Sequence, residues 1–266
     1  MKSSTIYYFS GTGNSWQAAK KLKEILPKSD LAPIVASMNK KEIQPPSQVI
    51  GFVFPIHLST IPIFILEFIK QLDLSGVEYI FAVASRVGTQ HSAFHELEKV
   101  LKKRGKKLNA FVSLNMPSND PKFGFKELSL EQVKIQENAW LEKIKLLAEA
   151  IKVTQDLRRP DDAFTTKVPL VNSLAWLVKL TDKIQQNFYA DEKCNGCGTC
   201  AQVCPSSKIV MVNGRPEWKK KVQCFKCHAC LNFCPQKAVQ IKGYTEKKGR
   251  YHHPYATADD IAQQKL

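Results

Sequence analysis

Residues Cys194–Pro205 read CNGCGTCAQVCP, and thirty positions later residues Cys224–Pro235 read CFKCHACLNFCP. Each stretch has the spacing C-x2-C-x2-C-x3-C-P, and together they contain all eight cysteines of the 266-residue chain. The N-terminus carries no apolar export signal, so we expect a cytoplasmic protein whose thiols bind metal rather than form disulfides. The repeat therefore predicts a small metal-binding domain.

Three cysteines at this spacing can wrap a compact loop around one iron–sulfur cubane, and the fourth, ahead of proline, ligates the other cluster in two-cluster ferredoxins. Structural zinc is the alternative, but it typically uses paired C-x2-C knuckles of four ligands. We therefore expect two [4Fe–4S] clusters with crossed ligands. One would be held by Cys194, Cys197, Cys200 and Cys234, and the other by Cys224, Cys227, Cys230 and Cys204.

The region around the repeat, residues 187–242, resembles bacterial-type ferredoxins. Asn187–Ala190 has the composition of a short strand, and Ile209–Val212 leads into an Asn-Gly hairpin signal. Ala238–Ile241 follows the second repeat as Lys208–Met211 follows the first. The resemblance implies a small α+β fold with pseudo-twofold symmetry, whose two clusters lie close enough for fast electron hopping.

Upstream of the repeat, short apolar runs alternate with stretches whose apolar residues recur at helical spacing. Near-continuous apolar runs predict buried parallel strands with helices on both faces, so we expect a five-stranded α/β sandwich. The expected strands are Thr5–Phe9, Leu31–Ser37, Val49–Phe54, Glu78–Ser85 and Leu108–Met116. The expected helices are Ser15–Leu26, Ser59–Leu72, Ser92–Arg104 and one that begins with a capping box at Ser129 and Gln132.

A glycine loop, SGTGNS, joins the first strand to the first helix. Backbone N–H groups at a helix N-terminus, backed by hydroxyls, suit a phosphate dianion. A Walker A loop needs a lysine after the second glycine, where Asn14 stands. A dinucleotide fingerprint needs a third glycine at position 16, where Trp16 stands. The loop resembles the phosphate loop of flavodoxins, which implies FMN and the strand order 2-1-3-4-5; an ordinary strand-to-helix turn is the alternative. The candidate phosphate ligands are Ser10, Gly11, Thr12, Gly13, Asn14 and Ser15.

Two more loops follow strands at the edge where a flavin ring would lie. Flavodoxin-like proteins usually have an aromatic side chain in the first and a glycine-rich turn in the second, and here His57 and Arg86 depart from that pattern. His57 either stacks on the ring or is a hydrogen-bonded loop histidine, and Arg86 either contacts the ligand or forms a surface ion pair. The candidate residues are Pro55, Ile56, His57, Ser85, Arg86, Val87 and Gly88.

The whole chain resembles the flavodoxin–ferredoxin fusion proteins of anaerobic bacteria and archaea, in its opening Ile6–Ser15 and its Gly51–Pro55 run. We expect an FMN-binding flavodoxin-like domain at residues 1–153, a linker and docking helix at 154–186, a two-cluster domain at 187–243 and a polar tail at 244–266. The helix would lie at Leu170–Leu180, which is too short to span a bilayer; an exposed helix that meets a partner or a membrane surface is the alternative.

The expected function is electron transfer between two clusters and FMN and on to a redox partner. One alternative is a flavin-dependent reductase of a small molecule, for which His57 is the only candidate acid in these loops; another is a ferredoxin with a docking domain that lacks FMN. The formal charge of +15 and the run Lys219–Lys221 favour an acidic redox protein as partner, although this run also fits a solvated surface. No nucleic-acid motif accompanies the charge, and no apolar stretch predicts a transmembrane segment.

Overall fold

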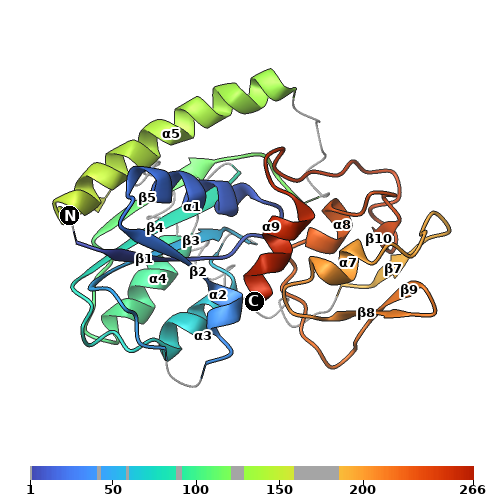
Figure 1. Ribbon diagram of the computed structural model, residues 1–266, viewed down its shortest axis with the longest axis horizontal. Helices are drawn as coiled ribbons and strands as arrows, with labels where there is room; N and C mark the ends of the chain where they lie inside the picture. The colour runs from blue at the N-terminus through green and yellow to red at the C-terminus, as the bar shows by residue number, and fades with distance from the viewer. Residues whose placement is uncertain (1, 41–42, 58–59, 88–91, 121–128, 159–185) are drawn as a thin grey trace.

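The computed structural model describes residues 2–40, 43–57, 60–87, 92–120, 129–158 and 186–266 (Figure 1). The helix expected at Leu170–Leu180 lies outside the described residues. Up to residue 158 the chain builds one large sheet flanked by helices, here called the sheet domain. Residues 186–243 form the cysteine domain, which has two small two-stranded sheets, and residues 244–266 are called the C-terminal segment.

The large sheet is parallel and has the strand order β2-β1-β3-β4-β5-β6, so its first five strands follow the predicted flavodoxin-like order. Its strands are β1 (Ser4–Tyr8), β2 (Ser29–Pro33), β3 (Val49–Pro55), β4 (Tyr79–Arg86), β5 (Ala110–Asn115) and β6 (Leu157–Arg158).

Two details of the predicted strands need correction. Strand β2 ends at Pro33, and residues Ile34–Ser37, expected to continue it, form the short helix α2. Proline has no N–H to donate to a further ladder bond, which favours a strand end there. The sheet also gains a sixth strand, β6, where a linker was expected, because Leu157 donates its backbone N–H to Asn109 O at 3.1 Å.

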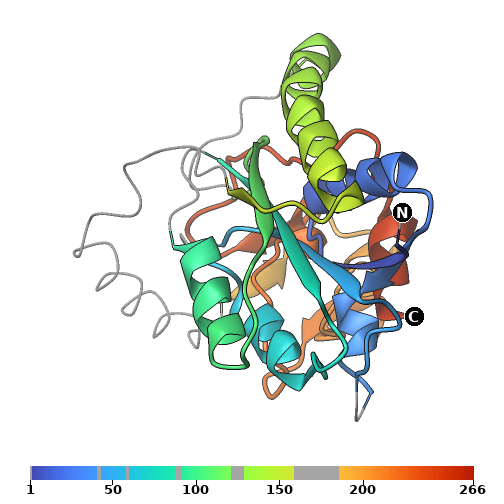
Figure 2. The same cartoon turned by 90° about the vertical axis from the view of Figure 1, so that its left-hand side faces the viewer.

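Helices cover both faces of the sheet, as the periodicity predicts (Figure 2). Helices α1 (Asn14–Ile25) and α5 (Leu130–Lys152) pack on one face, where Leu22, Trp140 and Ile144 belong to one buried cluster. On the other face lie α2, α3 (Ile63–Gln71) and α4 (Ala93–Lys102). The predicted capping box at the start of α5 is confirmed: Gln132 N donates to Ser129 Oγ, and Ser129 N donates to Gln132 Oε1.

The cysteine domain has the internal symmetry that its repeat predicts. Strand β7 (Phe188–Ala190) pairs antiparallel with β10 (Val239–Ile241), and β8 (Ile209–Val212) pairs with β9 (Arg215–Trp218). The Asn-Gly turn between β8 and β9 has two left-handed residues, with φ of 49° and 75°, as a two-residue hairpin requires. The short helices α7 (Thr199–Gln202) and α8 (Ala229–Asn232) each contain the third cysteine of one repeat.

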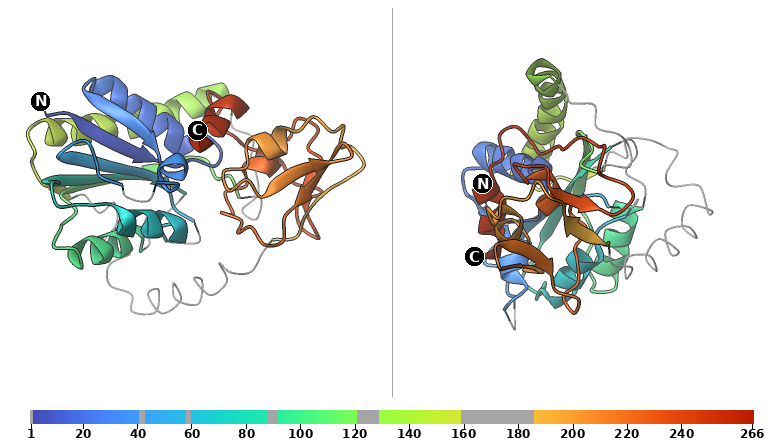
Figure 3. Two further views of the ribbon diagram at one scale, coloured as in Figure 1. Left: turned by 60° about the horizontal axis from the view of Figure 1, so that its bottom comes forward. Right: turned by 90° about the vertical axis from the view of Figure 1, so that its right-hand side faces the viewer.

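The C-terminal segment, expected to be a polar tail, folds back between the two domains. It forms helix α9 (Ala258–Ala262) and the 3-10 turn η2 (Gln263–Lys265), and Figure 3 shows α9 at the junction of the sheet and cysteine domains. Ile261 and Gln264 are completely buried, and His253, predicted to be solvated, is 2% exposed. The segment is polar in composition, but its few buried side chains suffice to anchor it.

Aromatic packing joins the cysteine domain to the sheet domain. The ring of Phe225 stacks on that of Phe64, with centroids 4.0 Å apart and planes 8° apart, and it meets Phe9 edge-on. Val203 and Ile261, from the cysteine domain and the C-terminal segment, belong to the same buried cluster as the α3 side of the sheet domain. The two domains therefore share one hydrophobic core.

The backbones of the two domains also approach each other closely at Gly11. A Cβ atom at this position would lie 2.4 Å from the carbonyl oxygen of Cys227 and 2.8 Å from its Cβ. Both distances are shorter than real carbon contacts, so no side chain fits here. Gly11 is therefore required by the docking of the two domains.

We expect Gly11→Ala to lower the free energy of unfolding by about 1–3 kcal/mol, as forced overpacking does. Gly76→Ala is the matched control, because a Cβ at Gly76 would meet nothing within 4 Å; its effect is expected to stay within about 0.5 kcal/mol. Urea denaturation followed by tryptophan fluorescence measures both. Equal midpoints for the two variants would contradict the close domain contact.

Candidate functional site

The eight cysteines gather in two sets, and each set draws on both repeats. The inner set lines one cavity, together with Lys208, Trp218 and Phe225; its members are Cys204, Cys224, Cys227 and Cys230. The outer set surrounds Cys200, whose pKa is raised to about 11, mainly by burial and in part by repulsion from the other three thiolates. The members of the outer set are Cys194, Cys197, Cys200 and Cys234.

Burial makes the thiols of Cys227 and Cys230 in the inner set poor acids on their own. It raises the pKa of Cys227 and Cys230 far above the usual thiol value, and the neighbouring thiolates raise both further. A thiolate is nevertheless the form that ligates metal. Four thiolates so placed can ionise together only beside cations, so the donor set fits a cluster whose irons supply positive charge.

Backbone N–H groups also point at the sulfurs, as cluster ligands require. Lys226 N donates to Cys224 Sγ at 3.3 Å, and Ala238 N donates to Cys234 Sγ at the same distance. Among the described residues, no three His, Cys, Asp or Glu side chains converge as the ligands of one ion would. A cubane separates its four thiolates by its own iron and sulfide atoms, so its ligands stand further apart than those of a single zinc ion.

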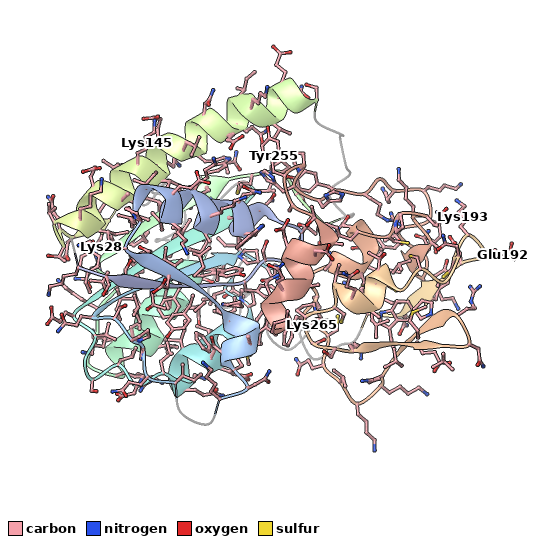
Figure 4. The ribbon with its side chains drawn as sticks, in the orientation of Figure 1. Lys28, Lys145, Glu192, Lys193, Tyr255 and Lys265 are labelled. Carbon is pink, nitrogen blue, oxygen red and sulfur yellow. The ribbon has the colours of Figure 1, made fainter. Side chains whose placement is uncertain are left out.

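The two sets differ in exposure. Cys197 of the outer set is exposed, whereas Cys204, Cys227 and Cys230 of the inner set are buried. Glu192 and Lys193, which precede the outer set, project from the end of the molecule remote from the sheet (Figure 4). The inner set faces the sheet domain, because Cys227 lies against Gly11.

The glycine loop, Ser10–Ser15, has the features of an anion site. Gly13 is left-handed, with φ of 98°, and helix α1 begins after it without any side-chain cap. The hydroxyl-bearing residues Ser10, Thr12 and Ser15 are buried. Among the described residues, the backbone N–H groups of Gly11, Thr12, Asn14 and Ser15 have no acceptor. Unpaired N–H groups at a helix N-terminus suit a phosphate.

The C-terminal segment holds this loop, which the sequence did not predict. The side-chain amide of Gln264 donates to Ser10 O and accepts from Ser10 N, both at 2.8 Å. His253 N donates to Thr12 O at 2.7 Å, and Tyr251 Oη donates to Asn14 Oδ1 at 2.9 Å. The capping pattern of Thr257 and Asp260 was a signal for α9, but no pattern indicates where such a helix docks.

The loops after β3 and β4 meet the glycine loop at the carboxyl edge of the sheet. The hydroxyls of Ser15 and Ser85 hydrogen bond at 2.8 Å, and Ile56 N donates to Ser85 O. Pro55 pairs with Ser85 in the ladder between β3 and β4. Arg86 is buried at the end of β4, Val87 is 54% exposed, and Gly88 lies outside the described residues.

His57 lies at the same edge and is partly buried. The pKa of His57 is lowered to about 4, mainly by burial. The charges of His228 and Lys226 also lower this pKa, whereas the charge of Asp120 raises it. Its Nε2 and the hydroxyl of Thr60 are buried and have no hydrogen-bond partner among the described residues. Buried polar atoms are normally paired, so these two atoms fit the polar rim of a ligand.

Residues after β5 tie this edge to the cysteine domain. Asn119 Nδ2 donates to Cys227 O at 3.3 Å, and Asn232 Nδ2 donates to Asn119 O at 3.1 Å. Tyr244 Oη donates to Asp120 Oδ1 at 3.0 Å. The carboxyl edge of the sheet, where open α/β proteins bind ligands, thus lies directly beside the inner set.

Comparison with known proteins identifies the cysteine domain. Residues 193–239 match the 4Fe-4S dicluster domain family. An uncharacterized ferredoxin of Methanocaldococcus jannaschii is 37% identical over 60 residues, which make up 21% of this chain and 78% of that ferredoxin.

Solved flavoproteins resemble the sheet domain more distantly. A flavoprotein from Bacteroides eggerthii is 20% identical, with a TM-score of 0.36, and the match covers 55% of this chain and 99% of that one. A flavodoxin from Megasphaera elsdenii is 16% identical, with a TM-score of 0.33, and covers 52% and 98%. TM-scores this low do not identify a fold. The flavodoxin-like description of the sheet domain rests on its strand order.

Within the described residues, no helix is long and apolar enough to cross a membrane. The crossed cysteine sets fit [4Fe–4S] clusters, and the strand order is that of a flavodoxin-like domain. The chain belongs to the dicluster 4Fe-4S ferredoxins through its cysteine domain, carries that domain after a flavodoxin-like one, and is an electron-transfer protein.

Proposed function

We propose that the protein relays single electrons from a redox partner through an outer and an inner [4Fe–4S] cluster to FMN held at the glycine loop, or in the reverse direction. The observation that carries this proposal is the contact between Gly11 and Cys227, which brings the phosphate loop against a ligand of the inner cluster. The proposed domain limits are residues 1–153 for FMN and 187–243 for the clusters.

The order of the relay follows from exposure. An electron must enter or leave where a partner can approach, and Cys197 is the exposed ligand. The inner set is buried against the sheet domain, so the inner cluster would stand between the partner and the flavin. A cubane carries one electron and a flavin one or two, so this order would couple a one-electron carrier to a two-electron acceptor.

The residues present fit FMN at the glycine loop. Buried hydroxyls and N–H groups without acceptors would hold the phosphate, and no basic side chain is needed. The unpartnered polar atoms of His57 and Thr60 lie at the edge where the ring would bind. In this reading, His57 would donate or accept one hydrogen bond at the ring.

A flavin-dependent reductase of a small molecule has less support. Its only candidate acid, His57, is neutral at pH 7 because burial lowers its pKa to about 4. A docking domain without FMN is favoured by one observation: Gly11 and Gly13 both pack against protein, namely Cys227 and Ala256. Titration of the protein with FMN distinguishes the docking domain, which would not bind FMN, from the relay and the reductase, which both would.

The crossed assignment of ligands predicts the outcome of paired substitutions. Cys204→Ala with Cys224→Ala removes two ligands from the inner set, so one intact [4Fe–4S] cluster, about four iron per chain, is expected to remain. Cys204→Ala with Cys194→Ala takes one ligand from each set, and no intact cluster is expected. Iron analysis and EPR spin counts of the reduced protein measure both. Uncrossed ligation would give the opposite result for the two pairs.

Flavin binding is expected to depend on Gln264. Gln264→Ala removes two hydrogen bonds that hold Ser10, and we expect the Kd for FMN to rise about tenfold, equivalent to roughly 1.4 kcal/mol. Gln263→Ala is the matched control, because this neighbouring side chain is exposed. Fluorescence titration measures both Kd values, with iron content as a check on folding. Wild-type protein that takes up no FMN would favour the docking-domain function instead.

The partner is proposed to be an acidic redox protein such as a small ferredoxin. Residues 188–266 hold 13 Lys and Arg against 6 Asp and Glu, and Lys219, Lys220 and Lys221 are all exposed and lie just before the second cysteine repeat in the sequence. A basic surface of this kind speeds the approach of an acidic protein. No nucleic acid is proposed, because no binding motif accompanies the charge.

Stopped-flow reduction by an acidic ferredoxin is expected to slow steeply between about 0.01 and 0.15 M ionic strength, as the screening length falls from about 30 to about 8 Å. Replacing Lys219, Lys220 and Lys221 by Gln should reduce the low-salt rate. Replacing three exposed lysines of the sheet domain, Lys20, Lys23 and Lys28, changes the total charge equally and should have a smaller effect. Equal effects of the two triple variants would exclude local docking at this run.

A further inference from the structure

One buried position that follows each repeat carries a charge in one half of the cysteine domain and none in the other. Lys208 follows the first repeat at the place that Ala238 occupies after the second. Both residues lie inside the cysteine domain, and Lys208 is only 3% exposed. A lysine is almost never buried without a compensating charge, so its place beside one set of cysteines needs a reason.

The surroundings of Lys208 satisfy its hydrogen bonds but not its charge. Its Nζ donates to Lys219 O at 2.6 Å and to Val222 O. Among the described residues, no carboxylate forms an ion pair with it. Backbone carbonyls are dipoles, and they leave the full positive charge in place. A buried cation without a counter-charge is destabilising by several kcal/mol.

The nearest source of negative charge is the inner set. Lys208 lines the same cavity as all four of its cysteines, and it favours the thiolate form of Cys224. A cubane with four thiolates carries a net charge of about −2 when oxidised and about −3 when reduced. A fixed cation in the wall of the cavity therefore stabilises the reduced form more than the oxidised one.

The outer set has a different electrostatic setting. Ala238 contributes a backbone N–H to Cys234 but no charge. Arg250 is a buried cation near Cys234, but the carboxylate of Asp191 also lies near it and offsets part of its charge. The equivalent position of the repeat thus carries a charge in one half of the domain only.

We propose that Lys208 is the buried counter-charge of the inner cluster and raises the reduction potential of that cluster. This inference rests on the proposed two-cluster function. The step it favours is the passage of one electron from the reduced outer cluster to the oxidised inner cluster, in which no bond forms or breaks. Lys208 would thus draw the electron toward the sheet domain and the flavin loop.

The test is an EPR-monitored redox titration of anaerobically purified protein with about eight iron per chain. Lys208→Gln keeps a donor for one carbonyl and removes the charge. We expect the one-electron reduction of one cluster to become at least tenfold less favourable, a shift of about 59 mV to lower potential, while the other cluster is unchanged. Lys208→Arg, which keeps the charge, is expected to restore most of the wild-type potential.

Lys219→Gln is the matched control, because this exposed lysine offers Lys208 only its backbone carbonyl; its potentials should match those of the wild type. Unchanged potentials in Lys208→Gln, or an equal shift of both clusters, would overturn the proposal. If Lys208→Gln loses the inner cluster, the iron content of Lys208→Arg decides between charge and shape. Eight iron per chain in Lys208→Arg would support a counter-charge. Four iron per chain would mean that only the shape of the lysine side chain matters, which overturns the proposal. A wild-type protein without eight iron would refute the proposed function itself.

Discussion

The close contact between the backbone of Gly11 and the carbonyl of Cys227 constrains the whole arrangement of the molecule. It leaves no space for a side chain, so the two domains can meet only where a glycine lies. The aromatic stack of Phe64 and Phe225 supplies apolar contact beside this point, and Asn119 supplies a hydrogen bond to the same carbonyl. The glycine loop and the loop that carries Cys227 are thereby held together by packing that neither domain could provide alone.

The parts of the fold that were predictable are those that repeat along the sequence. Apolar runs at strand length predicted five strands, and the repeated cysteine spacing predicted the dicluster domain, because both patterns express local geometry. The end of β2 was missed, since apolar residues continue past Pro33 into helix α2. The short strand β6 was missed because two residues in a polar stretch carry no detectable period.

The C-terminal segment was not predictable as a structural element of the site. Its sequence is mostly polar, and its anchoring depends on a few buried side chains, of which Gln264 and His253 would ordinarily be expected in solvent. Gln264 binds the backbone of Ser10 rather than another side chain. Such a contact requires only that the side-chain amide lies within hydrogen-bond distance of a backbone N–H and carbonyl. No periodicity or residue spacing in the sequence indicates such a contact.

The hydrogen bonds between Gln264 and Ser10 join residues that are 254 positions apart. Gln264 is translated only after Ser10 and both cysteine repeats. Contacts over such a separation form late, because closing so long a loop costs more conformational entropy than forming a local contact. The glycine loop therefore acquires its final hydrogen bonds only after the cysteine domain has been made, so the order of synthesis makes completion of this loop depend on a domain that is distant in the sequence.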